Sequence, residues 1–104
     1  MDAIVDMYGE EAVFVSPNPP MISDEFSTRV EGRDALRRCM EGVFAPMAPG
    51  TGFTTLEVLA GVDSAVVISK LGRSVGVDTL LYDSEGLIST HYDTSHFDLH
   101  SSEP

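Results

Sequence analysis

The stretch VDTLLYDSEGLI, residues 77–88, carries the clearest fold signal of this sequence. Two runs rich in β-forming residues flank the polar segment DSEG at residues 83–86. Such an arrangement is typical of a β-hairpin, closed either by a four-residue loop or by a turn followed by a glycine bulge. We therefore expect residues 74–82 and residues 87 to about 97 to form neighbouring antiparallel strands.

Upstream of this hairpin, the sequence predicts two more strands and one main helix. Residues 51–60 and 65–70 are expected strands, because they are rich in β-forming residues and turns at 61–64 and 71–73 separate them. Residues 32–45 repeat apolar positions at helical spacing, and Pro46 ends the segment. The apolar stripe comprises Ala35, Leu36, Cys39, Met40, Val43 and Phe44. Cys39 lies within the stripe, so we interpret it as a packing residue and not as a nucleophile.

The N-terminal third predicts a short helix over residues 1–8, a strand over 12–16 and a long proline-containing loop over 16–30. Long loops in compact domains are often functional. Helices followed by an antiparallel meander are the α+β pattern, in which the helices cover one face of the sheet. We expect a single domain over residues 1–104, with a polar tail at 98–104 that frays.

Asp78 is the most informative single residue, because both faces of its strand are largely apolar. A carboxyl group in such surroundings holds its proton unless it is paired, which suits a general acid or a hydrogen-bond donor in a pocket. The structural alternative is an acid that a nearby hydroxyl or backbone group satisfies. The residues alone leave these two interpretations open.

The register of the hairpin decides which residues accompany Asp78, and two registers are open. If residues 83–86 form the whole loop, Asp78 faces His91, and both share one face with Asp93. If Gly86 forms a bulge after a type I turn, Asp78 faces Tyr92, and His91 and Asp93 move to the opposite face. Gly86 itself favours the bulge.

Composition excludes several classes of partner. The 104 residues include 17 Asp and Glu against 6 Lys and Arg, which gives a formal net charge of −11. Nucleic acids and anionic membranes attract basic residues, so neither is an expected partner. No apolar run approaches the roughly 20 residues of a membrane span, and no basic leader opens the chain. With a single cysteine, we expect a cytoplasmic protein.

Neither a metal nor a cofactor is expected. The segment HYDTSHFDLH, residues 91–100, is rich in side chains that can bind metals. His91 and Asp93 share one side of the expected strand, whereas His96 and His100 do not, and a metal site needs convergent ligands. The sequence has no glycine-rich phosphate loop and no nucleophile elbow.

Four segments, in order, resemble the SnoaL-like and ketosteroid-isomerase-like branch of the nuclear transport factor 2-like superfamily. Residues 6–17, DMYGEEAVFVSP, resemble its LYAEDAVFxxP segment, and residues 31–36, EGRDAL, resemble the start of its middle helix. Residues 77–88 resemble its VDxxxFDxDGKI hairpin, and YDT at 92–94 resembles its YYDT ending. The resemblance spans nearly the whole chain and implies a cone, in which a curved antiparallel sheet wraps around helices and encloses an apolar pocket.

The resemblance also implies a long first helix, and we expect this helix to be missing from residues 1–104. Three explanations are open: the start is assigned too late, the pocket is more open than in relatives, or a partner subunit covers it. An uncovered apolar patch of several hundred Å² tends to recruit a partner. Members of the family commonly form homodimers through the outer face of the sheet, so a homodimer is the expected assembly.

Asp78, His91 and Asp93 are the catalytic candidates that the resemblance implies, and placing them in the pocket selects the first register. The implied ligand-contacting residues are Tyr8, Phe14, Ser16, Phe44, Phe53 and Leu80. Ser16 stands where ketosteroid isomerases have their carboxylate base, so the isomerase route of the family does not fit. Asp78 and Asp93 match the two acids of limonene epoxide hydrolase, another relative, but Gly76 stands where that enzyme has an arginine.

The leading hypothesis is therefore acid–base chemistry on a small hydrophobic substrate that resembles a polyketide, steroid or terpenoid. Asp78 would act as acid or hydrogen-bond donor, with His91 and Asp93 as base or orienting groups. The alternatives are a protein that binds a similar ligand without turnover and a dimerisation module without ligand chemistry. The fold that the resemblance implies accommodates all three.

Overall fold

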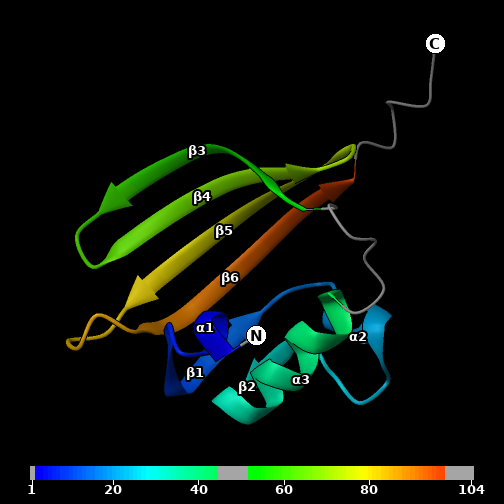
Figure 1. Ribbon diagram of the computed structural model, residues 1–104, viewed down its shortest axis with the longest axis horizontal. Helices are drawn as coiled ribbons and strands as arrows, with labels where there is room; N and C mark the ends of the chain where they lie inside the picture. Colours follow the sequence, from blue (N-terminus) through cyan, green and yellow to red (C-terminus); the bar gives the residue numbers. More distant parts are fainter. Residues whose placement is uncertain (1, 45–51, 98–104) are drawn as a thin grey trace.

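The computed structural model describes residues 2–44 and 52–97, with side chains over residues 3–42 and 52–94. Its elements (Figure 1) are α1 (Asp2–Val5), β1 (Tyr8–Val15), α2 (Pro19–Ile22), β2 (Arg29–Glu31), α3 (Arg33–Phe44), β3 (Thr54–Gly61), β4 (Ser64–Leu71), β5 (Ser74–Tyr82) and β6 (Ile88–Phe97). The predicted main helix and all four C-terminal strands are confirmed. The expected tail at 98–104 lies outside the described residues.

All six strands belong to one sheet with the order β2-β1-β6-β5-β4-β3. The meander from β3 to β6 is antiparallel, as the sequence predicts. β1 pairs in parallel with β6, and β2 adds to β1 in antiparallel fashion. The sheet is curved and does not close into a barrel (Figure 1), so the chain has the predicted α+β architecture.

Two expectations for the N-terminal third are wrong. The helix predicted over residues 1–8 ends at Val5, and Tyr8 already belongs to β1. The segment 16–30, expected to be a loop throughout, contains α2 and the start of β2. In β2 only Val30 is buried, between two exposed charged residues. Elements of three or four residues are too short to show a hydrophobic period in the sequence.

The turn between β5 and β6 follows the glycine-bulge alternative. Gly86 has a φ of 81°, which a glycine adopts without strain. The backbone N–H of Asp83 donates to the carbonyl of Leu87 at 2.8 Å. Tyr82 consequently pairs with Ile88, which is one residue away from the register of a simple four-residue loop.

A second irregularity follows at Ser89, where the register of β6 shifts by one more residue against the end of β5. Asp78 therefore faces Asp93, and Leu80 faces His91. Neither of the two residues expected directly opposite Asp78, His91 or Tyr92, occupies that position, although the side chain of His91 reaches Asp78. The predicted shared face is confirmed, because two shifts of one residue restore the alternation of the strand. Asp78, His91 and Asp93 all project from the concave face of the sheet, the face that α3 covers over β1.

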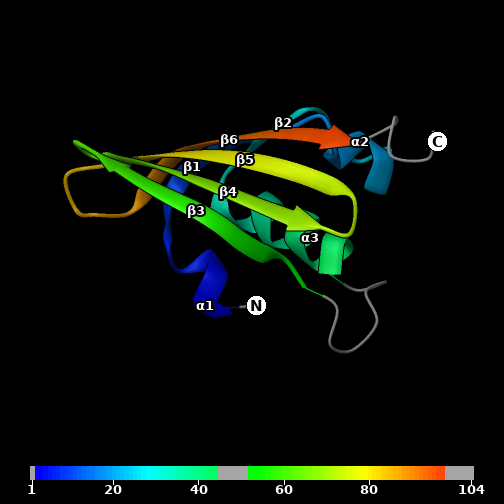
Figure 2. The same ribbon diagram turned by 90° about the horizontal axis from the view of Figure 1, so that it is seen from above.

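The core lies between α3 and the concave face of the sheet. Leu36 and Cys39 of α3 are fully buried, which agrees with the packing role predicted for Cys39. Burial also raises the pKa of the Cys39 thiol. The buried residues that surround them are Tyr8, Ala12, Phe14, Val30 and Ile88. Figure 2 shows α1 and α3 on the same side of the sheet.

The other face of the sheet carries no covering helix within the described part of the chain (Figure 2). Every residue of β3 is exposed. Leu59, Leu81 and Tyr92 point outward from β3, β5 and β6, and they are 52%, 38% and 46% exposed. Among the described helices, none is long and apolar enough to cross a membrane.

Candidate functional site

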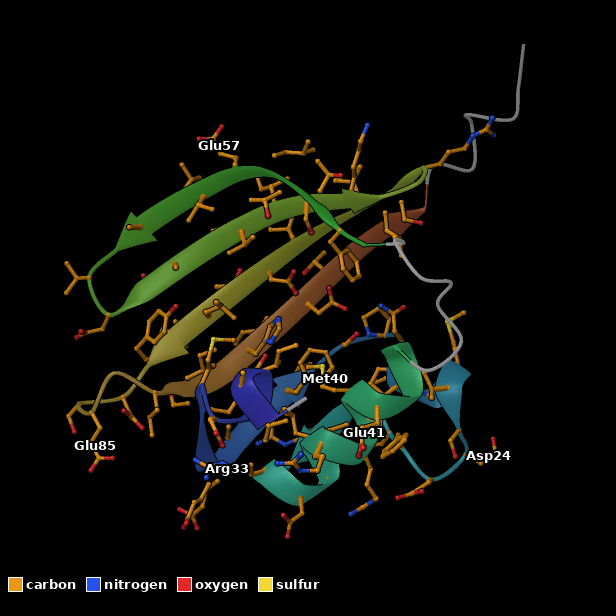
Figure 3. All side chains as sticks on the ribbon, in the orientation of Figure 1. Asp24, Arg33, Met40, Glu41, Glu57 and Glu85 are labelled. Carbon is orange, nitrogen blue, oxygen red and sulfur yellow. The ribbon has the colours of Figure 1, made fainter. Side chains whose placement is uncertain are left out.

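A cavity of about 730 Å³ opens between α2, α3 and the concave face of β4, β5 and β6. Its walls are mostly apolar and include Phe14, Ile22, Met40, Phe53, Val67 and Leu71. Figure 3 shows Met40 on the side of α3 that faces the sheet. Its polar lining residues are Ser16, Asn18, Thr55, Ser69, Ser74, Asp78, His91 and Asp93. An apolar hollow with a few convergent polar groups is the usual form of a small-molecule site.

A chain of two hydrogen bonds joins Tyr8, His91 and Asp78. The phenol Oη of Tyr8 lies 2.8 Å from Nδ1 of His91. On the other side of the ring, Nε2 lies 2.6 Å from Oδ1 of Asp78. Phe14 meets the imidazole edge-on at a centroid distance of 4.7 Å, and the Tyr8 ring stacks beside it at 6.0 Å. His91 is only 8% exposed, so its ring is held in one orientation.

Because each buried donor needs an acceptor, the hydrogen bonds between Tyr8, His91 and Asp78 can run in only one donor-to-acceptor order. Tyr8 is buried, and burial raises the pKa of its phenol, with the charge of Asp78 as the next cause. The phenol therefore keeps its proton and donates it to Nδ1, so that Nε2 carries the ring proton and donates to Asp78. The reverse direction would leave the Tyr8 proton without an acceptor among the described contacts. Asp78 is thus paired with His91 and accepts its hydrogen bond through Oδ1.

Asp93 has a separate set of donors. The hydroxyl of Ser16 donates to Oδ2 of Asp93 at 2.7 Å, and the side-chain amide of Asn18 donates to the same oxygen at 3.1 Å. The backbone N–H of Asn18 in turn donates to Ser16 Oγ at 3.1 Å. These donors hold the carboxyl group of Asp93 in one orientation. Asp93 also lies directly opposite Asp78 on the neighbouring strand, so two carboxylates from adjacent strands line one cavity.

The structure brings most of the predicted site residues together. Asp78, His91, Asp93, Phe14, Ser16 and Phe53 line the cavity. Tyr8 and Leu80 do not line it: Tyr8 is a core residue behind His91, and Leu80 packs against that core. The side chain of Phe44 lies outside the described residues. Across the described ranges, no group of three or more potential ligands could hold a metal ion.

Sequence reasoning missed four polar residues of the cavity, Asn18, Thr55, Ser69 and Ser74; of these, Asn18 binds a predicted site residue, Asp93. It lies between Pro17 and Pro19, in the segment that was expected to be only a loop. The hydroxyl of Ser16 accepts the Asn18 backbone N–H, and this local turn places the amide beside Asp93. The sequence offers one signal for it, an amide residue directly after the end of a strand and next to an inward-facing serine.

Comparison with known proteins identifies the fold. No family model and no curated protein matches this sequence. A SnoaL-like protein of unknown function from Burkholderia thailandensis superposes with a TM-score of 0.79 at 21% identity, over 91% of this chain and 79% of that protein. An NTF-2-like protein of unknown function from Burkholderia xenovorans gives 0.68 at 17% identity, over 99% and 79%.

A steroid Δ-isomerase from Pseudomonas aeruginosa is a further structural neighbour. It superposes with a TM-score of 0.65 at 18% identity, over 90% of this chain and 66% of the isomerase. These similarities show that the chain has the nuclear transport factor 2-like fold of these SnoaL-like, NTF-2-like and steroid-isomerase structures. At these identities the similarity identifies the fold alone, since one fold carries many activities.

Proposed function

We propose that this protein binds a small, largely apolar molecule in the cavity and catalyses an acid–base reaction on it. Isomerisation, cyclisation and hydrolysis of a polyketide-, steroid- or terpenoid-like compound are the candidate reactions. One observation carries the proposal: the His91–Asp78 pair, joined at 2.6 Å, and Asp93 face a mostly apolar cavity of about 730 Å³. Carboxyl groups that face such a cavity lie where they can act as general acid or base toward a bound ligand.

In this proposal Asp78 and Asp93 exchange protons with the ligand. His91 orients Asp78, because its ring is held from both nitrogens. Ser16 and Asn18 orient Asp93. Ser16 supports a carboxylate and does not replace one, so in this proposal the proton acceptors are Asp78 and Asp93 and not a residue at the end of β1. Asp78, His91 and Asp93 are the proposed catalytic residues, and Phe14, Ser16 and Phe53 are the proposed ligand contacts.

Deuterium exchange tests the catalytic part of the proposal. The protein is incubated in deuterated buffer with a steroid enone, a terpenoid ketone and an aromatic polyketide, and mass spectrometry follows deuterium uptake beside the carbonyl groups. We expect uptake with at least one compound, and a loss of about 100-fold or more in Asp78→Asn and in Asp93→Asn.

Glu85→Gln is the matched control, because it makes the same change of carboxylate to amide on the exposed β5–β6 turn, away from the cavity (Figure 3). It should leave uptake unchanged. If no compound exchanges, or if both Asn variants exchange at the rate of the unmodified protein, catalysis at this site is excluded.

Binding without turnover is the second candidate function. It is favoured by the engagement of both His91 ring nitrogens and of Asp93 Oδ2 in hydrogen bonds within the protein. Mass spectrometry of compounds retained by the protein from its native host distinguishes the two functions. A retained compound that survives prolonged incubation unchanged supports binding alone, whereas its conversion supports catalysis.

We further propose that the protein is a cytoplasmic homodimer that associates through the outer face of the sheet. The support is the apolar character of that face, where Leu59, Leu81 and Tyr92 are exposed. Exposed apolar patches of this extent commonly mark a protein–protein interface.

A further inference from the structure

We infer that the ligand presents a hydrogen-bond donor, a hydroxyl or amine group, to the Oδ2 atom of Asp78. This inference rests on the proposed function and narrows its ligand class. The hydrogen-bond chain from Tyr8 through His91 ends at Asp78, and its direction decides what the cavity offers to a ligand. Tyr8 is a positioning residue in this scheme, because it acts on the ligand only through His91 and Asp78.

The start of the chain is fixed by the surroundings of Tyr8. Its side chain is 4% exposed, and Arg33 of α3 holds the strand at this point by donating from Nη2 to the Tyr8 carbonyl at 2.6 Å. A buried phenol needs an acceptor for its proton, and Nδ1 of His91 at 2.8 Å is the acceptor within reach. Tyr8 thereby occupies the Nδ1 lone pair and leaves the ring proton on Nε2.

His91, in the middle of the three hydrogen-bonded residues, determines which role Asp78 has. Nε2–H donates to Oδ1 of Asp78 at 2.6 Å, which engages one carboxylate oxygen as an acceptor. The second oxygen, Oδ2, has no hydrogen-bond partner in the described part of the chain, and Asp78 lines the cavity with its side chain 27% exposed. The atom that faces the ligand, Oδ2 of Asp78, is therefore a hydrogen-bond acceptor.

An acceptor at this point selects among ligands of the same shape. A hydroxyl or amine group on the ligand can donate a hydrogen bond to Oδ2 of Asp78. A carbonyl or ether oxygen cannot donate, and its lone pairs repel those of Oδ2. A hydrogen bond to a charged group contributes about 1.5–3 kcal/mol, which corresponds to a preference of roughly tenfold or more. Asp78 thus serves a ligand hydroxyl or amine and not the carbonyl oxygen of a ketone.

Pyrene derivatives provide a matched set of probes for this inference. 1-Pyrenemethanol and 1-pyrenemethylamine carry a donor, and 1-(methoxymethyl)pyrene keeps the apolar body with an acceptor only. The sequence contains no tryptophan, so fluorescence anisotropy reports pyrene binding without interference. We expect the alcohol and the amine to bind roughly ten times or more as tightly as the ether.

Asp78→Asn provides the sharpest variant. Nε2–H of His91 would hold the amide oxygen, which leaves the amide nitrogen as a donor toward the cavity. The preference should then reverse and favour the ether. Glu85→Gln, the same change on the exposed turn, should keep the preference of the unmodified protein.

Nuclear magnetic resonance of nitrogen-labelled histidine tests the chain without any ligand. The sequence has three histidines, and His96→Gln and His100→Gln assign the signals of His91. We expect Nδ1 of His91 to be unprotonated and Nε2 to be protonated. Tyr8→Phe should move the Nδ1 resonance and leave Nε2 in place, while Tyr82→Phe, a control tyrosine at the edge of the same core, should move neither.

Each outcome decides a separate point. Equal binding of the alcohol and the ether, or a proton on Nδ1, overturns the inference and leaves the proposed pocket standing. An Nδ1 resonance that Tyr8→Phe leaves unmoved removes the positioning role of Tyr8. If none of the probes binds, both the donor preference and the apolar pocket of the proposed function are excluded.

Discussion

Tyr8 has no part in the surface of the cavity, yet its phenol controls the imidazole that lines it. Burial raises the pKa of Tyr8, and the charges of Asp78, Tyr82 and Asp93 raise it further. A core position that carries a hydroxyl group is costly unless the group is bonded. The bond to His91 is the reason why a tyrosine, and not a phenylalanine, stands at this position.

The raised pKa of Tyr8 predicts a loss of stability in alkali. An unfolded tyrosine releases its proton near pH 10, whereas folded Tyr8 keeps it. Above that pH the folded state binds more protons than the unfolded state, so the free energy of unfolding falls by up to about 1.4 kcal/mol per pH unit. Urea unfolding between about pH 9 and pH 11 measures this slope.

Tyr8→Phe should flatten the slope, and Tyr92→Phe, at an exposed tyrosine, should keep it. A slope that is the same in Tyr8→Phe and in the unmodified protein would contradict this account.

At the scale of elements, much of the arrangement could be predicted from sequence patterns. The turn residues at 61–64, 71–73 and 83–86 predict the meander, and the helical spacing of apolar residues predicts α3. The shared face of Asp78, His91 and Asp93 was also predicted, although by way of a pairing that is wrong. The parallel pairing of β1 with β6 could not be predicted, because it depends on contacts between distant segments and leaves no local pattern.

The bulge at Ser89 could not be predicted either, since no glycine or proline marks it. Its position is set by how β6 must pair with β5 and β1 together, which is a property of the folded sheet. The hydrogen bonds of Asp93 with Ser16 and Asn18 depend on the same pairing. Sequence reasoning therefore identified both carboxylates and His91, but not the hydrogen bonds of Ser16 and Asn18 to Asp93.

Insertion of one alanine after Thr90 tests whether the register of β6 positions the site. The added residue shifts the following part of β6 by one position against β5, which turns His91 and Asp93 away from the face of Asp78. His91 is 8% exposed and should resist diethyl pyrocarbonate in the unmodified protein. In the insertion variant it should react at least about ten times faster, because strand alternation places it on the uncovered face.

Ser89→Ala keeps the number of residues and removes only the hydroxyl that donates to the carbonyl of Leu81. Mass spectrometry of the modified peptides should show His91 protected in this control. A protected His91 in the insertion variant would mean that the strand repairs its register elsewhere.

At the scale of the whole molecule, the outer face of the sheet predicts association. A stable protein interface buries about 800 Å² on each partner, and the outer face of the sheet exposes Leu59, Leu81 and Tyr92. A combined Leu81→Glu and Tyr92→Glu variant should be monomeric in light scattering, because it places two carboxylates in that face.

Val62→Glu is the control for this prediction, since Val62 lies in the β3–β4 turn and is 93% exposed. It should leave the dimer intact. If the unmodified protein is monomeric at micromolar concentration, the proposed dimer is excluded.

High salt should strengthen association, because it screens repulsion between two chains that each carry a net charge of −11.

The pairing of β1 with β6 also determines when the cavity can come into existence. The Tyr8–His91 bond spans 83 positions of the sequence and the Ser16–Asp93 bond spans 77. A nascent chain on the ribosome therefore has no such cavity until β6 has emerged from the exit tunnel. Until then the apolar residues of β1 and α3 lack the neighbour that covers them in the folded protein, and they stay exposed during synthesis.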